Sequence, residues 1–392
     1  MPPSAQQHKC RSSIRSSHSS NINAMVVPAA AAPECGRREA VAAAAAAVFC
    51  RRGRGVVVPT VDMSAPAGRG ELSRQVARAC AGSGFFRAVN HGVPPRVSAA
   101  MDAAAAAFFA RAGAEKQLAG PPDPLGYGSR SIGANGDVGE LEYLILHASP
   151  DAVARKASAI DREDPRRFSQ VVNDYVEAVR QLACHVLDLL GEGLGLRDPT
   201  SLTRLITATD NDSLIRINHY PPSCAAAAGD HKSGGGPAPT AAIGFGEHTD
   251  PQILSVLRAN DADGLQLLLP DAAAAGDSVW VPVPPDPSAF FVNPRLSTIY
   301  FAAPPLHARI SALPETVAAG APRRYRAFTW AEYKRTMYTL RLSHNRLDLF
   351  HAGDGDGDAG GLLRTSSGRL NVTLNLSPFA ATENGVLVQF AK

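Results

Sequence analysis

The sequence contains few cysteines, and no two of them form a Cys-x-x-Cys pair. Six are spread over 392 residues, at Cys10, Cys35, Cys50, Cys80, Cys184 and Cys224. Small secreted proteins that depend on disulfides carry far more cysteine for their length. The distribution is typical of reduced intracellular thiols and argues against a disulfide framework.

The sequence also lacks an excess of one charge and a long apolar run. Lys and Arg total 39 against 36 Asp and Glu, for a net charge of +3, so no concentrated field favours nucleic acid or a membrane surface. The run at 40–49 is short and mostly alanine, well below the roughly 20 apolar residues of a membrane span. We predict a globular protein without nucleic-acid or membrane partners, cytoplasmic and able to diffuse into the nucleus. Its oligomeric state is left open.

The first 54 residues have the composition of a low-complexity or disordered leader. Residues 1–24 contain Lys9, Arg11 and Arg15 and no acidic residue, which fits a transit peptide. An upstream start codon before Met25 explains the same residues equally well.

The rest of the chain divides by its hydrophobic periodicity. Residues 55–205 are helix-rich, with helical periods at 71–84 and 168–190 and a strand between them. From 206 to 352, short apolar runs separated by Gly, Pro, Asn or Asp predict an antiparallel sandwich or jelly roll, followed by a helix at 328–342. The Gly/Ala/Pro-rich insertion at 224–242 is predicted to be a mobile surface loop. Residues 353–392 are predicted to be a weakly ordered tail.

His248 and Asp250 lie two residues apart in "FGEHTDPQ", just before an apolar run. Two imidazoles and one carboxylate on one face form the common Fe(II) site of oxygen chemistry, and the sequence signature is His-x-Asp followed by a distant histidine. The tripeptide alone is weak evidence, because a chain with 11 histidines often contains one by chance.

The surroundings of this pair strengthen the hypothesis. Arg295 and Ser297, in "PRLS", are two apart on a predicted strand and so share a face. Arginine can fork onto a carboxylate while the serine hydroxyl adds a further hydrogen bond. Asn218 and Tyr220, in "RINHYPP", also share a face, and Tyr220 could donate to the same acid. Taken singly, Arg295 could be a surface strand residue and Tyr220 a core aromatic.

Together, these motifs resemble those of the plant 2-oxoglutarate and Fe(II)-dependent dioxygenases: NxYP, HxD, a distal His and RxS. The stretches 126–146, 244–267 and 328–350 look like the gibberellin 2-beta-dioxygenases that act on C19 gibberellins. The resemblance runs from about residue 55 to 352. One departure is local: Glu140 and Leu141 stand where that subgroup usually has Trp and Val.

The resemblance implies a mixed α/β fold, with a double-stranded β-helix (jelly-roll) core flanked by N- and C-terminal helices. It also implies 2-beta-hydroxylation of C19 gibberellins, with Fe(II), 2-oxoglutarate and O2, and with ascorbate as reductant. His248 and Asp250 would be metal ligands, and Arg295, Ser297 and Tyr220 would hold 2-oxoglutarate. Tyr127 and Arg130, in the "GYGSR" loop, are candidates near a gibberellin carboxylate. No further catalytic residue is assigned.

The distal histidine expected by this resemblance is missing. Residues 251–306 contain no histidine, and the chain passes directly from Asn293 to Pro294, where the family continues through two strands and their turns. We predict that about 20 to 27 residues are absent there. His307, which follows the RxS pair, would need a different strand to present it. Loss of one ligand and two strands predicts weak iron binding and an opened sheet.

Three alternatives remain at this point. The chain could be a catalytically inactive splice or gene-model variant, or a dioxygenase of another plant small molecule such as a flavonoid. The third alternative is a zinc or manganese jelly-roll protein of the cupin kind. Such a protein would be expected to have more histidines in its strands and would not require Arg295 together with Ser297.

Overall fold

The computed structural model describes residues 59–82, 84–132, 136–221, 244–259, 265–270, 278–283, 295–317, 322–342, 346–352 and 386–390. The predicted leader, the insertion at 224–242 and the junction between Asn293 and Pro294 lie outside these ranges. Within them, no helix combines the length and the apolar character needed to cross a bilayer.

Most of the helices lie before residue 208, as the periodicity predicts. They are α2 (Arg69–Ala81), α3 (Pro95–Phe109), α4 (Gly113–Gln117), α5 (Pro150–Ile160), α6 (Pro165–Gly193), α7 (Ser201–Thr207) and α8 (Trp330–Thr339), with 3-10 turns η2 (Pro314–Thr316) and η3 (Arg346–Phe350). The predicted helices at 71–84, 168–190 and 328–342 are confirmed as α2, α6 and α8. Helix α6 starts where Asp164 accepts a hydrogen bond from the Arg167 backbone N–H and Pro165 takes the first helical position.

The strands form one large sheet and two small ones. They are β1 (Thr60–Asp62), β2 (Phe85–Val89), β3 (Gly126–Ile132), β4 (Asp137–His147), β5 (Leu214–Tyr220), β6 (Leu254–Ala259), β7 (Gln266–Pro270), β8 (Ser278–Pro282), β9 (Arg295–Ala302), β10 (Arg309–Ile310), β11 (Phe328–Thr329) and β12 (Val386–Phe390). The eight-stranded sheet has the order β1-β2-β12-β6-β9-β5-β4-β3. Only the β1–β2 pair in it is parallel.

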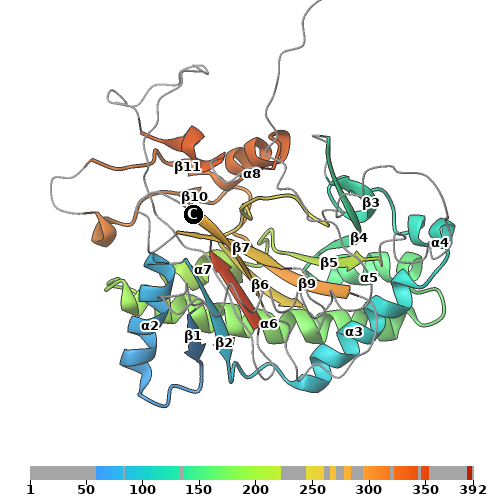
Figure 1. Cartoon of the computed structure of the whole chain (residues 1–392), viewed down its shortest axis with the longest axis horizontal. Helices are drawn as coiled ribbons and strands as arrows, with labels where there is room; N and C mark the ends of the chain where they lie inside the picture. Colours follow the sequence, from blue (N-terminus) through green and yellow to red (C-terminus); the bar gives the residue numbers. More distant parts are fainter. Residues whose placement is uncertain are drawn as a thin grey trace, which may run out of the picture.

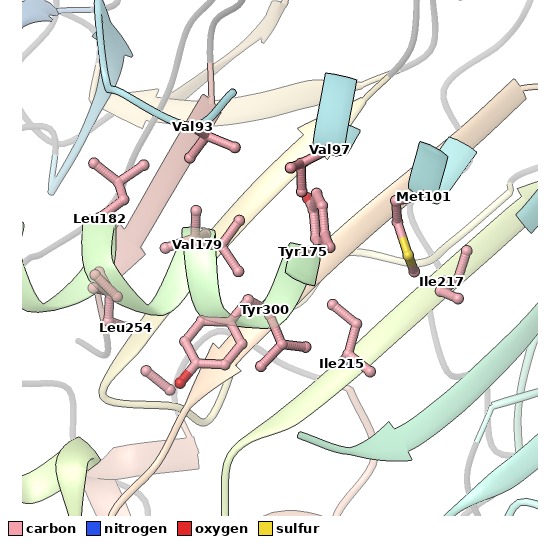
Figure 2. Packing of buried hydrophobic residues seen from close by; sticks show 14 of the residues in the cluster. Val93, Val97, Met101, Tyr175, Val179, Leu182, Ile215, Ile217, Leu254 and Tyr300 are labelled. Atoms are coloured by element: carbon pink, nitrogen blue, oxygen red, sulfur yellow. The ribbon is translucent and has the colours of Figure 1, made fainter. Parts of the chain in front are cut away.

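Helices cover one face of this sheet, which we call the helix face (Figure 1). Alternate residues of the strands point there, including Ile215 and Ile217 of β5 and Tyr300 of β9, and they join the largest buried cluster. Figure 2 shows Tyr175 of α6 beside Val97 of α3, and Met101 of α3 close to Ile217 of β5. This packing of α6 holds the central strands in place, and their other side chains form the opposite face of the sheet.

The opposite face, which we call the site face, carries several smaller apolar clusters. The β7–β8 hairpin packs Leu267 and Val281 on Phe85 of β2. Helix α8 belongs to a separate cluster with Phe328 and Phe350, and its segment lies across the sheet from α6 (Figure 1). Helix α8 is tied to the start of β5 by Lys334, whose ammonium donates to both Asp212 carboxylate oxygens at 2.8 and 2.6 Å.

Five residues within the tail of 353–392, which the sequence predicts to be weakly ordered, form strand β12. Strand β12 inserts between β2 and β6 and is antiparallel to both, with Val388 opposite Phe86 on one side and Val256 on the other. The run "VLVQF" has the β-branched and apolar residues that suit a central strand. Its partners lie more than 120 residues earlier in the chain, a separation that local patterning does not reveal.

Candidate metal and organic-acid site

Three adjacent strands bring the predicted co-substrate residues together on the site face. Asn218 of β5 pairs with Tyr143 of β4 on one side and with Ser297 of β9 on the other. The Asn218 amide nitrogen donates to the Ser297 hydroxyl at 3.1 Å, and the Tyr220 hydroxyl is hydrogen-bonded to both side chains. Burial raises the pKa of Tyr220 above its usual value, so its hydroxyl stays protonated and able to donate at neutral pH.

Arg295 begins β9 directly opposite Tyr220 and two residues before Ser297. The register therefore places it at the same end of the sheet as these two residues. The strand pairing therefore brings Arg295, Ser297 and Tyr220 to one position in the sheet, the grouping that the sequence predicts.

The loop at 244–250 closes over this end of the sheet. A Cβ on Gly244 would lie 2.9 Å from the Tyr220 ring, and one on Gly139 would lie 2.3 Å from the Gly244 carbonyl oxygen. Glycine at both positions lets the loop backbone approach β4 and β5 this closely. The approach sets the position of His248 and Asp250 next to Tyr220.

His248 and Asp250 are oriented as two ligands of one ion would be. The His248 Nε2 lies 3.3 Å from Asp250 Oδ1, and its Nδ1 lies 2.7 Å from the Gly246 carbonyl oxygen. That carbonyl can only accept, so Nδ1 donates to it, and the neutral form of the ring would then offer its Nε2 lone pair to a metal. The His248 ring also packs 4.2 Å from the Phe245 ring, which limits its rotation.

Arg216 completes the buried polar cluster. Its side chain, on a residue only 9% exposed, donates from Nε to Asn218 Oδ1 at 2.7 Å. Its guanidinium carbon lies 4.3 Å from the centre of the Tyr143 ring and 4.9 Å from that of Phe245. Burial lowers the pKa of Arg216 below its usual value.

Tyr127 and Arg130 are placed away from this cluster. Tyr127 pairs with Leu144 on the helix face and lies edge-on to Phe108, with ring centres 5.9 Å apart. Arg130 has a side chain that is 75% exposed and forms an ion pair with Glu140 at 3.1 Å. The structure does not bring either residue to His248.

A third metal ligand is not present among the described residues, where no group of three His, Cys, Asp or Glu side chains could hold an ion. His307 is 78% exposed and lies 3.5 Å from Asp210. His219 points to Glu142, at 3.9 Å, and His91 accepts from the Val93 backbone N–H at 3.1 Å. The described residues supply two ligands and do not complete an Fe(II) triad.

Arg216 is the site residue that the sequence reasoning missed. It stands two residues before Asn218 and four before Tyr220 in "RINHY", so strand alternation places all three on one face. The two-residue spacing by which Asn218 and Tyr220 were identified also applies to Arg216 and could have identified it.

Two protein-family models match this chain, one in each half. The 2OG-Fe(II) oxygenase superfamily matches residues 211–302, and the N-terminal region of non-haem dioxygenases in morphine synthesis matches residues 58–162. The rice dioxygenase for auxin oxidation has a similar structure, with a TM-score of 0.57 and 25% identity over 76% of this chain and 100% of that one. JOX2 in complex with 2OG, Fe and JA has a TM-score of 0.59 at 21% identity, covering 79% of this chain and 97% of that one, and supports the fold alone.

The fold is therefore that of a 2-oxoglutarate and Fe(II)-dependent oxygenase, and the predicted double-stranded β-helix core is confirmed. Among curated relatives, gibberellin 2-beta-dioxygenase 2 of Oryza sativa subsp. japonica is 92% identical over 357 positions, covering 84% of this chain and 96% of the relative. Gibberellin 2-beta-dioxygenase of Phaseolus coccineus is 41% identical over 325 positions, covering 76% and 92%. The chain belongs to the gibberellin 2-beta-dioxygenase family.

The lengths of these alignments indicate missing residues. The rice alignment spans 357 positions, yet 84% of 392 residues is about 329, so about 28 positions of the relative face gaps in this chain. Because 92% of 357 is about 328, nearly every aligned residue is identical, and gaps account for most of the difference. The Phaseolus alignment, with 325 positions against about 298 residues, gives about 27 in the same way. Both totals are close to the 20 to 27 residues that the sequence predicts to be absent.

Proposed function

We propose that this chain is a form of a C19 gibberellin 2-beta-dioxygenase that retains organic-acid binding residues and has little or no hydroxylase activity. The reaction assigned to the complete site is 2-beta-hydroxylation of a C19 gibberellin, coupled to oxidative decarboxylation of 2-oxoglutarate, with ascorbate as reductant. Its product is an inactive hormone. The observation that carries the proposal is the pairing of His248 and Asp250 without a third ligand among the described residues.

In this proposal His248 Nε2 and Asp250 are the two remaining metal ligands. Tyr220, Ser297 and Arg295 receive the distal carboxylate of 2-oxoglutarate, because a guanidinium with neighbouring hydroxyl donors matches the geometry of a carboxylate. The interlocked hydrogen bonds of Asn218 with Ser297 and Arg216 hold these donors in place before the acid binds. Two ligands alone form a poor chelate, since water replaces the organised imidazole.

The test compares this chain with a version in which the rice relative's segment is restored between Asn293 and Pro294. Both proteins are assayed for Fe(II) affinity and for 2-beta-hydroxylation of a C19 gibberellin, with 2-oxoglutarate and ascorbate supplied. We expect the restored chain to be active and to bind Fe(II) at least about 100-fold more tightly, because even loss of a residue that only supports a ligand costs 10- to 100-fold. A His248→Ala variant of the restored chain is the matched control, and it should fall to the level of this chain.

Two outcomes would contradict the proposal in different ways. Equal turnover by both chains would show that the missing segment supplies nothing the reaction needs. Absence of turnover in both, with the restored chain folded and binding Fe(II), would overturn the gibberellin substrate.

A further inference from the structure

Arg216 is a buried cation whose hydrogen bonds are incompletely satisfied. Its Nη2 is fully buried and has no hydrogen-bond partner, and no carboxylate among the described residues forms an ion pair with it. Among the described residues, its guanidinium donates to a neutral acceptor, the Asn218 amide oxygen. Native proteins rarely leave a buried charge in this condition, because desolvation of an unpaired guanidinium is costly.

Aromatic rings hold the guanidinium in place, while the carboxylate of Asp250 acts on it without forming an ion pair. The Tyr143 and Phe245 rings, at 4.3 and 4.9 Å, present their electron-rich faces to it. A Cβ on Gly128 would come within 2.5 Å of the Tyr143 hydroxyl, and that hydroxyl donates to the Ser131 carbonyl oxygen at 2.8 Å. Tyr143 therefore fits against a residue without a side chain, and its ring position over Arg216 is fixed.

Phe245 ties Arg216 to the candidate metal loop. The same ring that packs on the guanidinium packs on the His248 imidazole, so the unpartnered nitrogen belongs to the cluster around His248 and Asp250. An anionic group bound within this cluster would supply the partner that Nη2 lacks.

We propose that Arg216 binds the carboxylate of the organic substrate and selects for substrates that carry one. This inference rests on the proposed function, in which Arg295, Ser297 and Tyr220 already receive the distal carboxylate of 2-oxoglutarate. Arg216, whose guanidinium is buried on the same face of the sheet, then serves a second organic acid. C19 gibberellins are carboxylic acids, and a charge-assisted hydrogen bond from a buried arginine would discriminate strongly against an uncharged ester.

The experiment measures binding by calorimetry, so that it does not depend on turnover. A C19 gibberellin and its methyl ester are titrated into the full chain with 2-oxoglutarate present, and the titrations are repeated in the chain with the restored segment. We expect the acid to bind about 10- to 100-fold more tightly than the ester. Arg216→Met should abolish this preference, and Arg216→Lys should keep part of it, since the charge remains while the forked geometry is lost.

A stability measurement separates binding from a structural role. Without ligand, Arg216→Met should change the melting temperature little, because removal of a buried charge without an ion-pair partner offsets the loss of the hydrogen bond to Asn218. Arg326→Met is the matched control: Arg326 also lies over an aromatic ring, 4.9 Å from Phe350, but has its own carboxylate partner, Glu332, at 2.7 Å. It should leave the preference for the acid unchanged.

The outcomes are distinct. Equal binding of acid and ester by the wild type overturns the role of Arg216 and leaves the proposed function standing. Loss of 2-oxoglutarate binding in Arg216→Met, with the acid preference retained, assigns the residue to the co-substrate and overturns the inference. Loss of the preference in Arg130→Met, and not in Arg216→Met, would assign the carboxylate to the residue favoured by the sequence. Failure of acid and ester to bind in both backgrounds overturns the inference together with the gibberellin substrate.

Discussion

The two faces of the eight-stranded sheet are built in different ways. On the helix face, α2, α3, α5 and α6 bury one continuous apolar cluster. On the site face, the described residues form small separate apolar clusters around a polar core of Arg216, Asn218 and Ser297. The comparison indicates that stability resides mainly on the helix face, whereas the site face carries buried polar groups that cost stability to maintain.

Two adjacent phenylalanines of β2 test this division most directly. Phe86 is fully buried in the large helix-face cluster, and Phe85 is 2% exposed in the small cluster under the β7–β8 hairpin. Phe86→Ala should lower the free energy of unfolding by about 3 to 5 kcal/mol. Phe85→Ala should cost roughly 2 kcal/mol, because the hairpin can relax into the space. Urea unfolding of both variants measures the difference, and equal losses would contradict the division of stability between the faces.

The helix face should also dominate the response to acid. Burial, followed by the nearby charge of Arg258, lowers the pKa of His91 to about 4, from an ordinary value near 6.5. The unfolded chain therefore takes up a proton at a higher pH than the folded chain does. The stabilisation is complete above pH 6.5 and is lost as the pH falls toward 4, by roughly 3 kcal/mol at most.

Thermal unfolding of His91→Gln between pH 4 and 7 tests this dependence. The melting temperature of His91→Gln should depend much less on pH than that of the wild type. His307→Gln, at an exposed position, should keep the wild-type dependence. His147, His185 and His219 are shifted in the same direction by burial, so a residual slope is expected. An unchanged slope in His91→Gln would show that acid acts elsewhere.

The same contrast explains which features could be predicted from the sequence. Helices α2 and α6 were predictable because their apolar residues repeat with a helical period along one uninterrupted segment. The grouping of Tyr220 with Ser297 was predictable because each lies in a short motif with two-residue spacing. The absence of a third ligand was predictable because residues 251–306 contain no histidine.

What could not be predicted depends on pairing between distant segments. Tyr127 lies in the "GYGSR" stretch that resembles the family, but only the register with Leu144 shows that it faces the helices. Strand β12 pairs with β2 and β6, which are far away in the sequence. Arg216 can be recognised as a buried cation only from its packing against Tyr143 and Phe245, which are distant from it in the sequence.

A smaller effect tests whether the polar core of the site face is organised in advance of ligand binding. Ser297 and Ser255 are both buried and both face this side, since Ser255 pairs with Phe301 of β9, four residues after Ser297 on the same strand. The Ser297 hydroxyl accepts from Asn218, whereas the Ser255 hydroxyl has no partner. Ser297→Ala should cost about 1 to 2 kcal/mol, because it removes an acceptor of the buried Asn218 amide N–H and a hydrogen-bond partner of Tyr220. Ser255→Ala should be neutral or stabilising by up to about 1 kcal/mol, because it removes an unsatisfied group. If urea unfolding gives the two variants the same stability, the Asn218–Ser297 bond contributes nothing to the fold. The site would then gain its order only when an organic acid binds.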